Sequence, residues 1–190
     1  MSRFEKVSFE RWAADCGIKG LPEAELREWY EDIKLPKQAT AASAGCDFYM
    51  PFNLNFEAHS KFRIASGVRW VTDEDRGLCS EGNKGDGSDM SLNDHQEHKT
   101  PSPTVLLIVP RSGLGFKYGI RLSNTVGVID ADYCDSDNEG HIIVSLENPS
   151  DQTVELPAGK PFCQGIIVSY EIPEGAESDA HRNGGFGSTD

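Results

Sequence analysis

The stretch Val105-Leu106-Leu107-Ile108-Val109-Pro110-Arg111-Ser112-Gly113-Leu114-Gly115 decides the fold class of this chain. Five consecutive apolar residues that end at a Pro are typical of a buried β-strand. The runs 142–146 and 166–168 are similar, and each is bounded by Gly, Pro or Asn. With 19 Gly and 10 Pro in 190 residues, the composition favours many short strands joined by turns. The pattern predicts an all-β domain, a sandwich or barrel of the jelly-roll kind.

Residues 1–34 differ from the rest and are predicted to form a helical extension. Pro22 stands near a helix start, followed by acidic residues. A shorter helix is expected around Trp12. The second helix should carry an apolar stripe at positions i, i+3, i+4 and i+7, formed by Leu26, Trp29, Tyr30 and Ile33. We interpret this segment as an appendage packed on the β domain (35–178), and a partner-docking arm is the alternative.

Residues 73–103 are almost free of apolar side chains and are predicted to be a solvated polar insertion.

The formal net charge of -13 argues against general nucleic-acid binding, which needs Lys and Arg to displace counterions from phosphates. No apolar run approaches the length of a membrane span, so we expect no membrane contact and a cytoplasmic protein. The five cysteines are scattered and odd in number, which makes a disulfide framework an unlikely basis for the fold.

Two segments carry side chains suited to a phosphorylated ligand. After the strand, Arg111 offers a planar fork of N–H donors, Ser112 a hydroxyl, and the glycines a turn with backbone N–H groups free to contact an anion. In the segment 124–133, Asn124 has both a donor and an acceptor, which suits the edge of a uracil ring. Asp130 can accept a proton from an attacking water, and Tyr133 can stack on a sugar.

Each of three further segments, taken singly, fits a structural interpretation as well as a functional one. Asp47 follows small residues at the start of a strand, and Gln164 is polar in an otherwise apolar strand. The Gly-rich tail 179–190 is predicted to be a lid, because it carries Arg182, Phe186, Gly187, Ser188 and Thr189.

Together these five segments, in this order across residues 35–190, resemble the motifs of the homotrimeric dUTP diphosphatases (dUTPases). The resemblance implies a jelly roll or distorted β-barrel of the dUTPase type, and a homotrimer whose active sites are each built from all three chains. It also implies Mg²⁺-assisted hydrolysis of dUTP to dUMP and pyrophosphate. This reaction keeps uracil out of DNA and supplies dUMP for thymidylate synthesis.

The resemblance assigns a role to each motif residue. Asp130 would hold the water that attacks the α-phosphorus, Tyr133 would stack on the deoxyribose, and Asn124 with the backbone at Gly127 would bind uracil. Asp47 would support the metal through water. Contacts to the phosphates are implied for Arg111, Ser112, Gly113 and Gln164. From the tail, Phe186 would stack over uracil, Gly187 and Arg182 would contact the nucleotide, and Ser188 and Thr189 would reach the γ-phosphate.

The sequence departs from the family pattern in three places. His181 stands where the tail usually has its Arg, and Arg182 follows one residue later. Residues 134–139 intervene between Tyr133 and the next Gly and are expected to lengthen a hairpin around uracil. The insertion 73–103 is the third departure.

The dCTP deaminases are a related alternative, disfavoured by Gly113 where they continue with a second Ser. A catalytically weakened regulatory protein that binds nucleotide is the other alternative.

Overall fold

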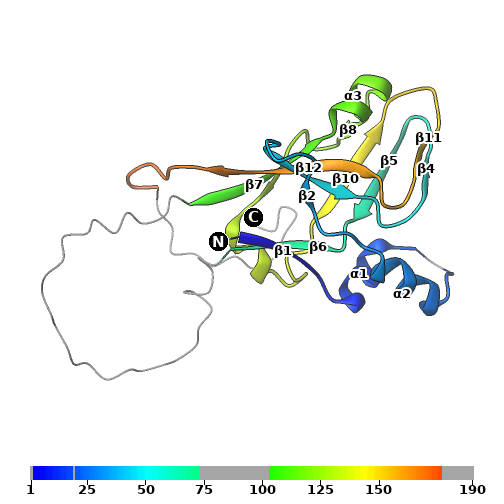
Figure 1. Ribbon diagram of the computed structural model, residues 1–190, viewed down its shortest axis with the longest axis horizontal. Helices are drawn as coiled ribbons and strands as arrows, with labels where there is room; N and C mark the ends of the chain where they lie inside the picture. The colour runs from blue at the N-terminus through cyan, green and yellow to red at the C-terminus, as the bar shows by residue number, and fades with distance from the viewer. Residues whose placement is uncertain (1, 19, 73–102, 177–190) are drawn as a thin grey trace, which may run out of the picture.

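The computed structural model describes residues 2–18, 20–72 and 103–176 (Figure 1). The lid predicted over 179–190 and all but the last residue of the predicted insertion 73–103 lie outside these ranges. The described part is built mostly of β-strands that enclose one hydrophobic core, so the all-β prediction is confirmed.

The predicted strand before Arg111 lies inside a five-stranded antiparallel sheet. In spatial order the strands are β2 (Lys37–Gln38), β3 (Gly45–Tyr49), β12 (Pro161–Ser169), β7 (Thr104–Pro110) and β9 (Gly127–Ile129). Along β7 the side chains alternate, so that Leu106 and Ile108 are buried while their neighbours are half-buried. One face of this sheet therefore covers the core.

Three smaller sheets complete the described β domain, and one of them includes the N-terminus and is described below. The first has the order β5 (Ser60–Ala65), β10 (Ile143–Asn148) and β8 (Arg121–Leu122). The second pairs β4 (Leu54–Phe56) with β11 (Val154–Leu156). The runs 142–146 and 166–168 thus form strands as predicted, in β10 and β12.

The prediction that residues 1–34 are helical throughout was wrong for the first residues. They form strand β1 (Ser2–Lys6), which pairs antiparallel with β6 (Val68–Thr72) from Ser2 opposite Thr72 to Lys6 opposite Val68. The pairing partner lies more than sixty residues along the chain, and a five-residue strand has no local signal strong enough to replace it. The N-terminus is therefore part of a sheet rather than a purely helical appendage.

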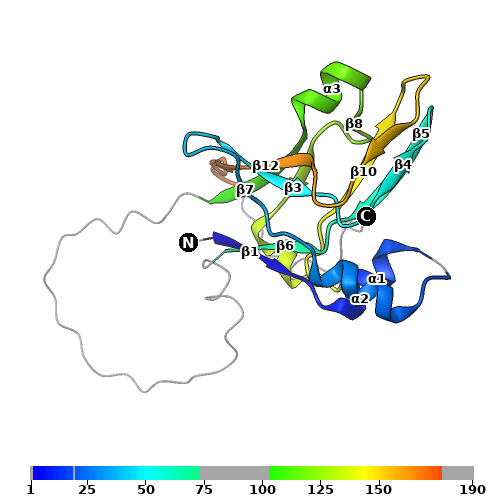
Figure 2. The same ribbon diagram turned by 45° about the vertical axis from the view of Figure 1, so that its right-hand side comes forward.

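The two predicted helices are present as α1 (Phe9–Cys16) and α2 (Glu23–Glu31), side by side below β6 (Figure 2). Trp12 of α1 is fully buried, and its indole N–H donates to the carbonyl of Ala65 over 3.0 Å. The Tyr30 hydroxyl of α2 donates to the carbonyl of Val7 over 2.6 Å. Ile33 is buried in the same core. These contacts support the interpretation of the segment as a packed part of the domain.

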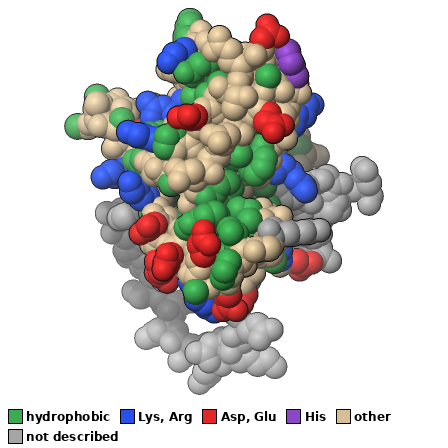
Figure 3. Space-filling view, turned by 90° about the vertical axis from the view of Figure 1, so that its right-hand side faces the viewer, with side chains coloured by type: hydrophobic (Ala, Val, Ile, Leu, Met, Phe, Trp, Pro, Cys, Tyr) green, Lys and Arg blue, Asp and Glu red, His purple; other side chains and the backbone are tan. Residues whose placement is uncertain are grey.

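The outer side of these helices is acidic. Helix α2 and the residue after it carry Glu23, Glu25, Glu28, Glu31 and Asp32. Figure 3 shows acidic side chains gathered on this lower part of the surface, below a central group of hydrophobic side chains. Such a surface repels phosphate backbones. None of the helices in the described ranges is long and apolar enough to cross a membrane.

Candidate functional site

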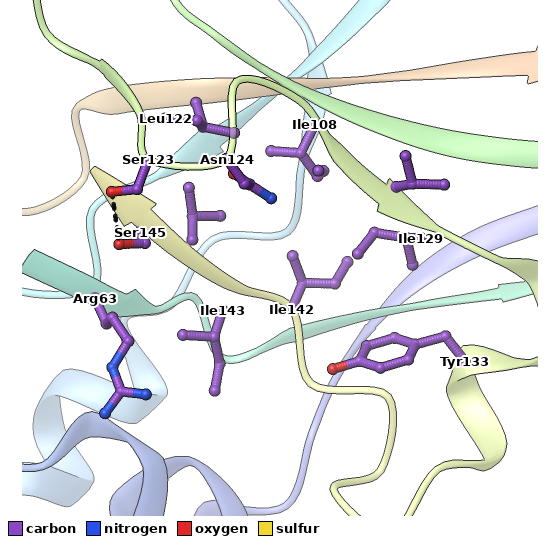
Figure 4. A pocket seen from close by; sticks show the side chains of 13 residues that line it. Arg63, Ile108, Leu122, Ser123, Asn124, Ile129, Tyr133, Ile142, Ile143 and Ser145 are labelled. Atoms are coloured by element: carbon purple, nitrogen blue, oxygen red, sulfur yellow. Dashed lines mark hydrogen bonds between the residues drawn. The ribbon is translucent and has the colours of Figure 1, made fainter. Parts of the chain in front are cut away.

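A cavity of about 480 Å³ opens beside β9, between the edges of the two larger sheets (Figure 4). This volume lies in the range of small-molecule sites. Most of its wall is apolar and consists of Ile108, Leu122, Val128, Ile129, Ile142, Ile143 and Val144. The polar groups are few and are contributed by Arg63, Ser123, Asn124, Tyr133 and Ser145. A mostly apolar wall with a few placed polar groups suits a flat ring that carries hydrogen-bonding edges.

Three residues predicted to bind the nucleoside meet in this cavity. Asn124 lies in the exposed turn between β8 and β9, Gly127 begins β9, and Tyr133 follows in the 3₁₀ helix η2 (Ala131–Asp135). A methyl group at Gly127 would lie 3.1 Å from Cβ of Ile108, so a side chain there would crowd the cavity wall. The structure therefore brings together the three residues to which the sequence assigned uracil and sugar.

The ring of Tyr133 is fixed at one edge of the cavity. Its hydroxyl donates to the carbonyl of His141 over 3.2 Å and accepts from the side-chain amide of Asn138 over 2.8 Å. The residue is only 7% exposed, so the ring has little freedom to turn. A ring held in this way presents a constant surface to a ligand.

Asp130, the predicted general base, lies between β9 and η2 and is half-buried. It follows Ile129, which lines the cavity, but Asp130 itself is not part of the lining. Its carbonyl accepts a hydrogen bond from the backbone N–H of Tyr133 over 3.1 Å. Asp130 therefore follows a lining residue along the chain without lining the cavity itself.

The predicted lengthened hairpin was wrong. β9 pairs with β7, whereas β10 pairs with β5 and β8, so the two strands that flank residues 130–142 belong to different sheets. Between them the chain forms η2 and two further turns instead of a ladder. The extra residues 134–139 are accommodated by this compact loop, and Ile142 and Ile143 after it line the cavity.

The residues assigned to phosphate gather at a second place. An N–H of Arg111 donates to the carboxylate of Asp47 over 2.9 Å, which joins the first two motifs. Gln164 of β12 lies directly opposite Asp47 in the register with β3. A methyl group at Gly45 would stand 2.6 Å from Oε1 of Gln164, so a larger residue there would displace that amide from its present position. Asp47 is 7% exposed, and its charge is balanced by the guanidinium.

The turn predicted at Ser112 and Gly113 is in fact the start of a helix, α3 (Ser112–Tyr118), with Arg111 at its N-cap. The small residues are compatible with a turn, but Gly115 donates to the carbonyl of Arg111 over 3.1 Å and closes a helical turn. Ser112 and Gly113 remain exposed in the first turn. A helix start also presents backbone N–H groups, so the contact with an anion predicted for this segment stays a prediction.

Within residues 2–18, 20–72 and 103–176, one chain does not join the two groups in a single cavity. Among the described residues, none of the phosphate group lines the cavity that contains Tyr133. Figure 1 shows α3, which follows Arg111, at the top of the view and the yellow-green turn that follows β9 near the bottom. The tail residues Arg182, Phe186, Gly187, Ser188 and Thr189, with His181, lie outside the described residues.

Sequence reasoning missed several cavity residues. Arg63 of β5 lies opposite Ser145 of β10, and the Ser145 hydroxyl hydrogen-bonds that of Ser123 over 2.9 Å (Figure 4). These side chains become neighbours only when β5, β10 and β8 pair. Only strand register could have revealed them, because no local motif marks them.

His141 is a buried titratable group behind the cavity. Its Nε2 accepts from the N–H of Gly67 over 2.9 Å, so Nδ1 carries the proton and donates to Asp15 over 2.6 Å. Burial lowers the pKa of His141 below its usual 6.5, although the neighbouring carboxylates of Asp15 and Glu139 act in the opposite direction. The neutral imidazole is therefore part of the folded state.

This lowered pKa predicts a loss of stability in mild acid. As the pH falls, His141 is protonated in the unfolded chain before it is protonated in the folded chain. The free energy of unfolding should therefore fall as the pH drops below about 6.5. Glu5 and Glu139, whose pKa values are lowered from 4.5, lose their contributions only at more acidic pH. Thermal unfolding of His141→Gln between pH 7.5 and 5.5 should lack this pH dependence. Equal slopes for both proteins would contradict the assignment.

Comparison with known proteins agrees with this geometry. The sequence signature of the dUTPase family matches residues 95–190, half of the chain. A deoxyuridine 5'-triphosphate nucleotidohydrolase from Thiobacillus denitrificans is 46% identical over 88 residues, which cover 44% of this chain and 57% of that protein. The chain thus spans little more than half the length of this relative. The corresponding protein of Gamma-proteobacterium EBAC31A08 is 31% identical over 83% of this chain and 95% of its own length.

A solved structure matches the fold as well. The dUTPase of Streptococcus mutans superimposes with a TM-score of 0.57 and 27% identity, and covers 91% of this chain and 99% of its own. The β-rich architecture is therefore of the jelly-roll type predicted from the sequence. On the signature, the relatives and the fold together, this chain belongs to the dUTPase family.

Proposed function

We propose that this chain hydrolyses dUTP to dUMP and pyrophosphate, as the names of its relatives state for those proteins. The observation that carries the proposal is the cavity where Asn124, Gly127 and Tyr133 meet. Asp130 directly follows the lining residue Ile129 in the chain. Asn124 can pair with the edge of uracil, and the fixed ring of Tyr133 would stack on the deoxyribose and leave no space for a 2′-hydroxyl.

The chemistry assigned to the chain is attack of a water on the α-phosphorus. Asp130 would accept a proton from that water while the water oxygen forms the new bond to phosphorus. The bond between the α-phosphorus and the bridging oxygen breaks, and pyrophosphate leaves. Arg111 would stabilise the charge that develops on the phosphate oxygens, because a guanidinium matches two oxygens at once. Ser112, Gly113 and Gln164 would add neutral hydrogen bonds.

The donor set fits a magnesium ion that is bound largely through the substrate. In the described ranges, no group of three His, Cys, Asp and Glu side chains is placed to hold a metal ion. Mg²⁺ usually keeps several waters and combines substrate phosphates with one or two carboxylates. Asp47 is the carboxylate beside Arg111, so we assign to it a contact with Mg²⁺ through water. The bound ion would neutralise part of the triphosphate charge.

A homotrimer with shared sites would reunite the separate groups. The phosphate group around Arg111 does not line the cavity around Tyr133 in the described part of one chain, so we propose that a neighbouring chain completes each site. Exposed apolar side chains support self-association: Phe116 is 95% exposed, and Val128 of β9 is 60% exposed. The tail residues 179–190 would close over the nucleotide from another subunit.

The reaction can be tested by product analysis in ¹⁸O-labelled water. With Mg²⁺, the chain should convert dUTP to dUMP and pyrophosphate, and the label should appear in dUMP because water attacks the α-phosphorus. Removal of Mg²⁺ with EDTA should stop the reaction. Label in pyrophosphate would refute attack at the α-phosphorus, and release of inorganic phosphate with dUDP would refute the proposed activity.

A further inference from the structure

Glu139 has an unusual backbone conformation for its residue type. Its φ of 60° places it in the left-handed region, which few residues other than Gly adopt. Its carboxylate reaches across to helix α1, where it accepts from the backbone N–H of Ser8 over 2.7 Å and from the Ser8 hydroxyl over 2.6 Å. The strain of this conformation is compensated by two charge-assisted hydrogen bonds.

These contacts complete the cap of α1. The Ser8 hydroxyl accepts from the N–H of Arg11 over 3.1 Å, as an N-cap residue does. In a capping box, a Glu three residues later would bond back to the N-cap N–H. Here that position is Arg11, and Glu139 supplies the missing carboxylate from 131 residues away. Helix α1 and the loop 134–141 therefore share one hydrogen-bonding unit.

A second contact joins the same two elements. The ring of His141, which is fully buried, donates to Asp15 in the last turn of α1. Asp15 is held in turn by Arg11, whose Nε donates to it over 2.9 Å. The loop is thus attached to both ends of α1, by Glu139 at the start and by His141 at the end.

The loop in turn holds Tyr133. The Asn138 amide donates to the Tyr133 hydroxyl, and that hydroxyl donates to the carbonyl of His141. Gly140, with φ 70°, lets the chain turn back so closely that a methyl group there would lie 2.5 Å from Cα of Cys134. Any movement of residues 138–141 would therefore move the hydroxyl of Tyr133.

We propose that helix α1 positions the Tyr133 wall of the nucleotide cavity, acting through Glu139 and His141. Ser8 and Asp15 are then positioning residues, far from the ligand but coupled to its sugar-binding surface. The ligand part of this inference rests on the proposed function. The N-terminal segment has a use beyond packing, because it sets the loop that accommodates the extra residues 134–139.

The variant Ser8→Asp tests this directly. Asp is as good an N-cap residue as Ser, so α1 should form, but its carboxylate would repel that of Glu139. We expect amide exchange of residues 133–142 to increase. KM for dUTP should rise about tenfold, or ~1.4 kcal/mol of binding, with kcat nearly unchanged, because sugar contacts contribute equally to ground and transition states. Preference for dUTP over UTP should fall.

Ala14→Asp adds the same charge to an exposed position of α1 as a control.

The double variant Ser8→Asp/Glu139→Gln should restore the amide exchange of residues 133–142, the KM for dUTP and the preference for dUTP over UTP. The reason is that the Gln amide can donate to the new carboxylate. Faster exchange without a change in KM or selectivity would overturn the positioning role, and so would unchanged exchange. Lack of turnover in the unaltered chain would refute the proposed function instead. In that case the exchange of residues 133–142 and its rescue still decide whether α1 holds the loop.

Discussion

Asp130→Asn is expected to lower the turnover of dUTP by about 10²–10⁴-fold, the usual contribution of a general base. The amide has nearly the same shape as the carboxylate but cannot take the proton of the attacking water. Nucleotide binding should persist, because the cavity residues Asn124, Gly127 and Tyr133 are unchanged. The measurement is kcat by pyrophosphate release, with nucleotide affinity by calorimetry.

Asp137→Asn is the matched control for this prediction. It removes the same charge from an exposed position in the loop that follows η2. Turnover of this variant should stay close to that of the unaltered chain. A drop of less than tenfold in Asp130→Asn, or an equal drop in both variants, would rule out the general-base role of Asp130.

Trp12→Ala is expected to reduce the free energy of unfolding by about 3–5 kcal/mol, the range for buried Trp or Phe replaced by Ala. Trp12 is fully buried between α1 and the β5–β6 turn, and its N–H satisfies the carbonyl of Ala65. The change would leave both a cavity and an unpaired acceptor. Chemical denaturation at fixed protein concentration measures the effect.

Leu35→Ala serves as the control, because Leu35 directly follows the N-terminal segment 1–34 but is 43% exposed. Its effect should be within about 0.5 kcal/mol, as for surface substitutions. Equal small effects for both variants would mean that α1 is a dispensable appendage, and the partner-docking alternative for residues 1–34 would regain support.

Local patterns in the sequence predicted the elements whose signals are local. The apolar run before Arg111, the helical spacing from Leu26 to Tyr30 and the Pro22 helix start each depend on neighbouring residues only, and all three match the structure. Ile33, predicted as the last member of the helical stripe, is buried in the core but lies beyond the end of α2 at Glu31. Strand β1 has no such signal, since it is stabilised by β6. The helix at Ser112 was missed because Gly-rich sequence favours a turn locally, and its strand and sheet context decided otherwise.

The residues of the candidate site could likewise be predicted only where their signals are local in the sequence. Asn124, Gly127 and Tyr133 were found because they lie within ten residues of one another, and the cavity brings them together. The Arg111–Asp47 pair joins separate motifs and became visible only with the sheet. Arg63 and Ser145 had no motif at all. The attachment of Glu139 to Ser8 spans most of the chain, so no sequence pattern could have revealed it.

The regulatory alternative receives no specific support from the described residues. The N-terminal helices pack into the domain core, which leaves the acidic outer side of α2 as their exposed part. An interaction through that surface would be additional to the proposed hydrolysis and would not depend on the nucleotide cavity.

The most direct measurement is pyrophosphate release with Mg²⁺ from dUTP, dTTP, dCTP and UTP, compared side by side as kcat/KM. We expect fast release from dUTP and strong rejection of dCTP, because a site built to hydrogen-bond uracil mismatches the cytosine edge. UTP should be rejected by the ring of Tyr133. Equal rates with all four nucleotides, or no release from dUTP, would contradict the assignment of the cavity to deoxyuridine.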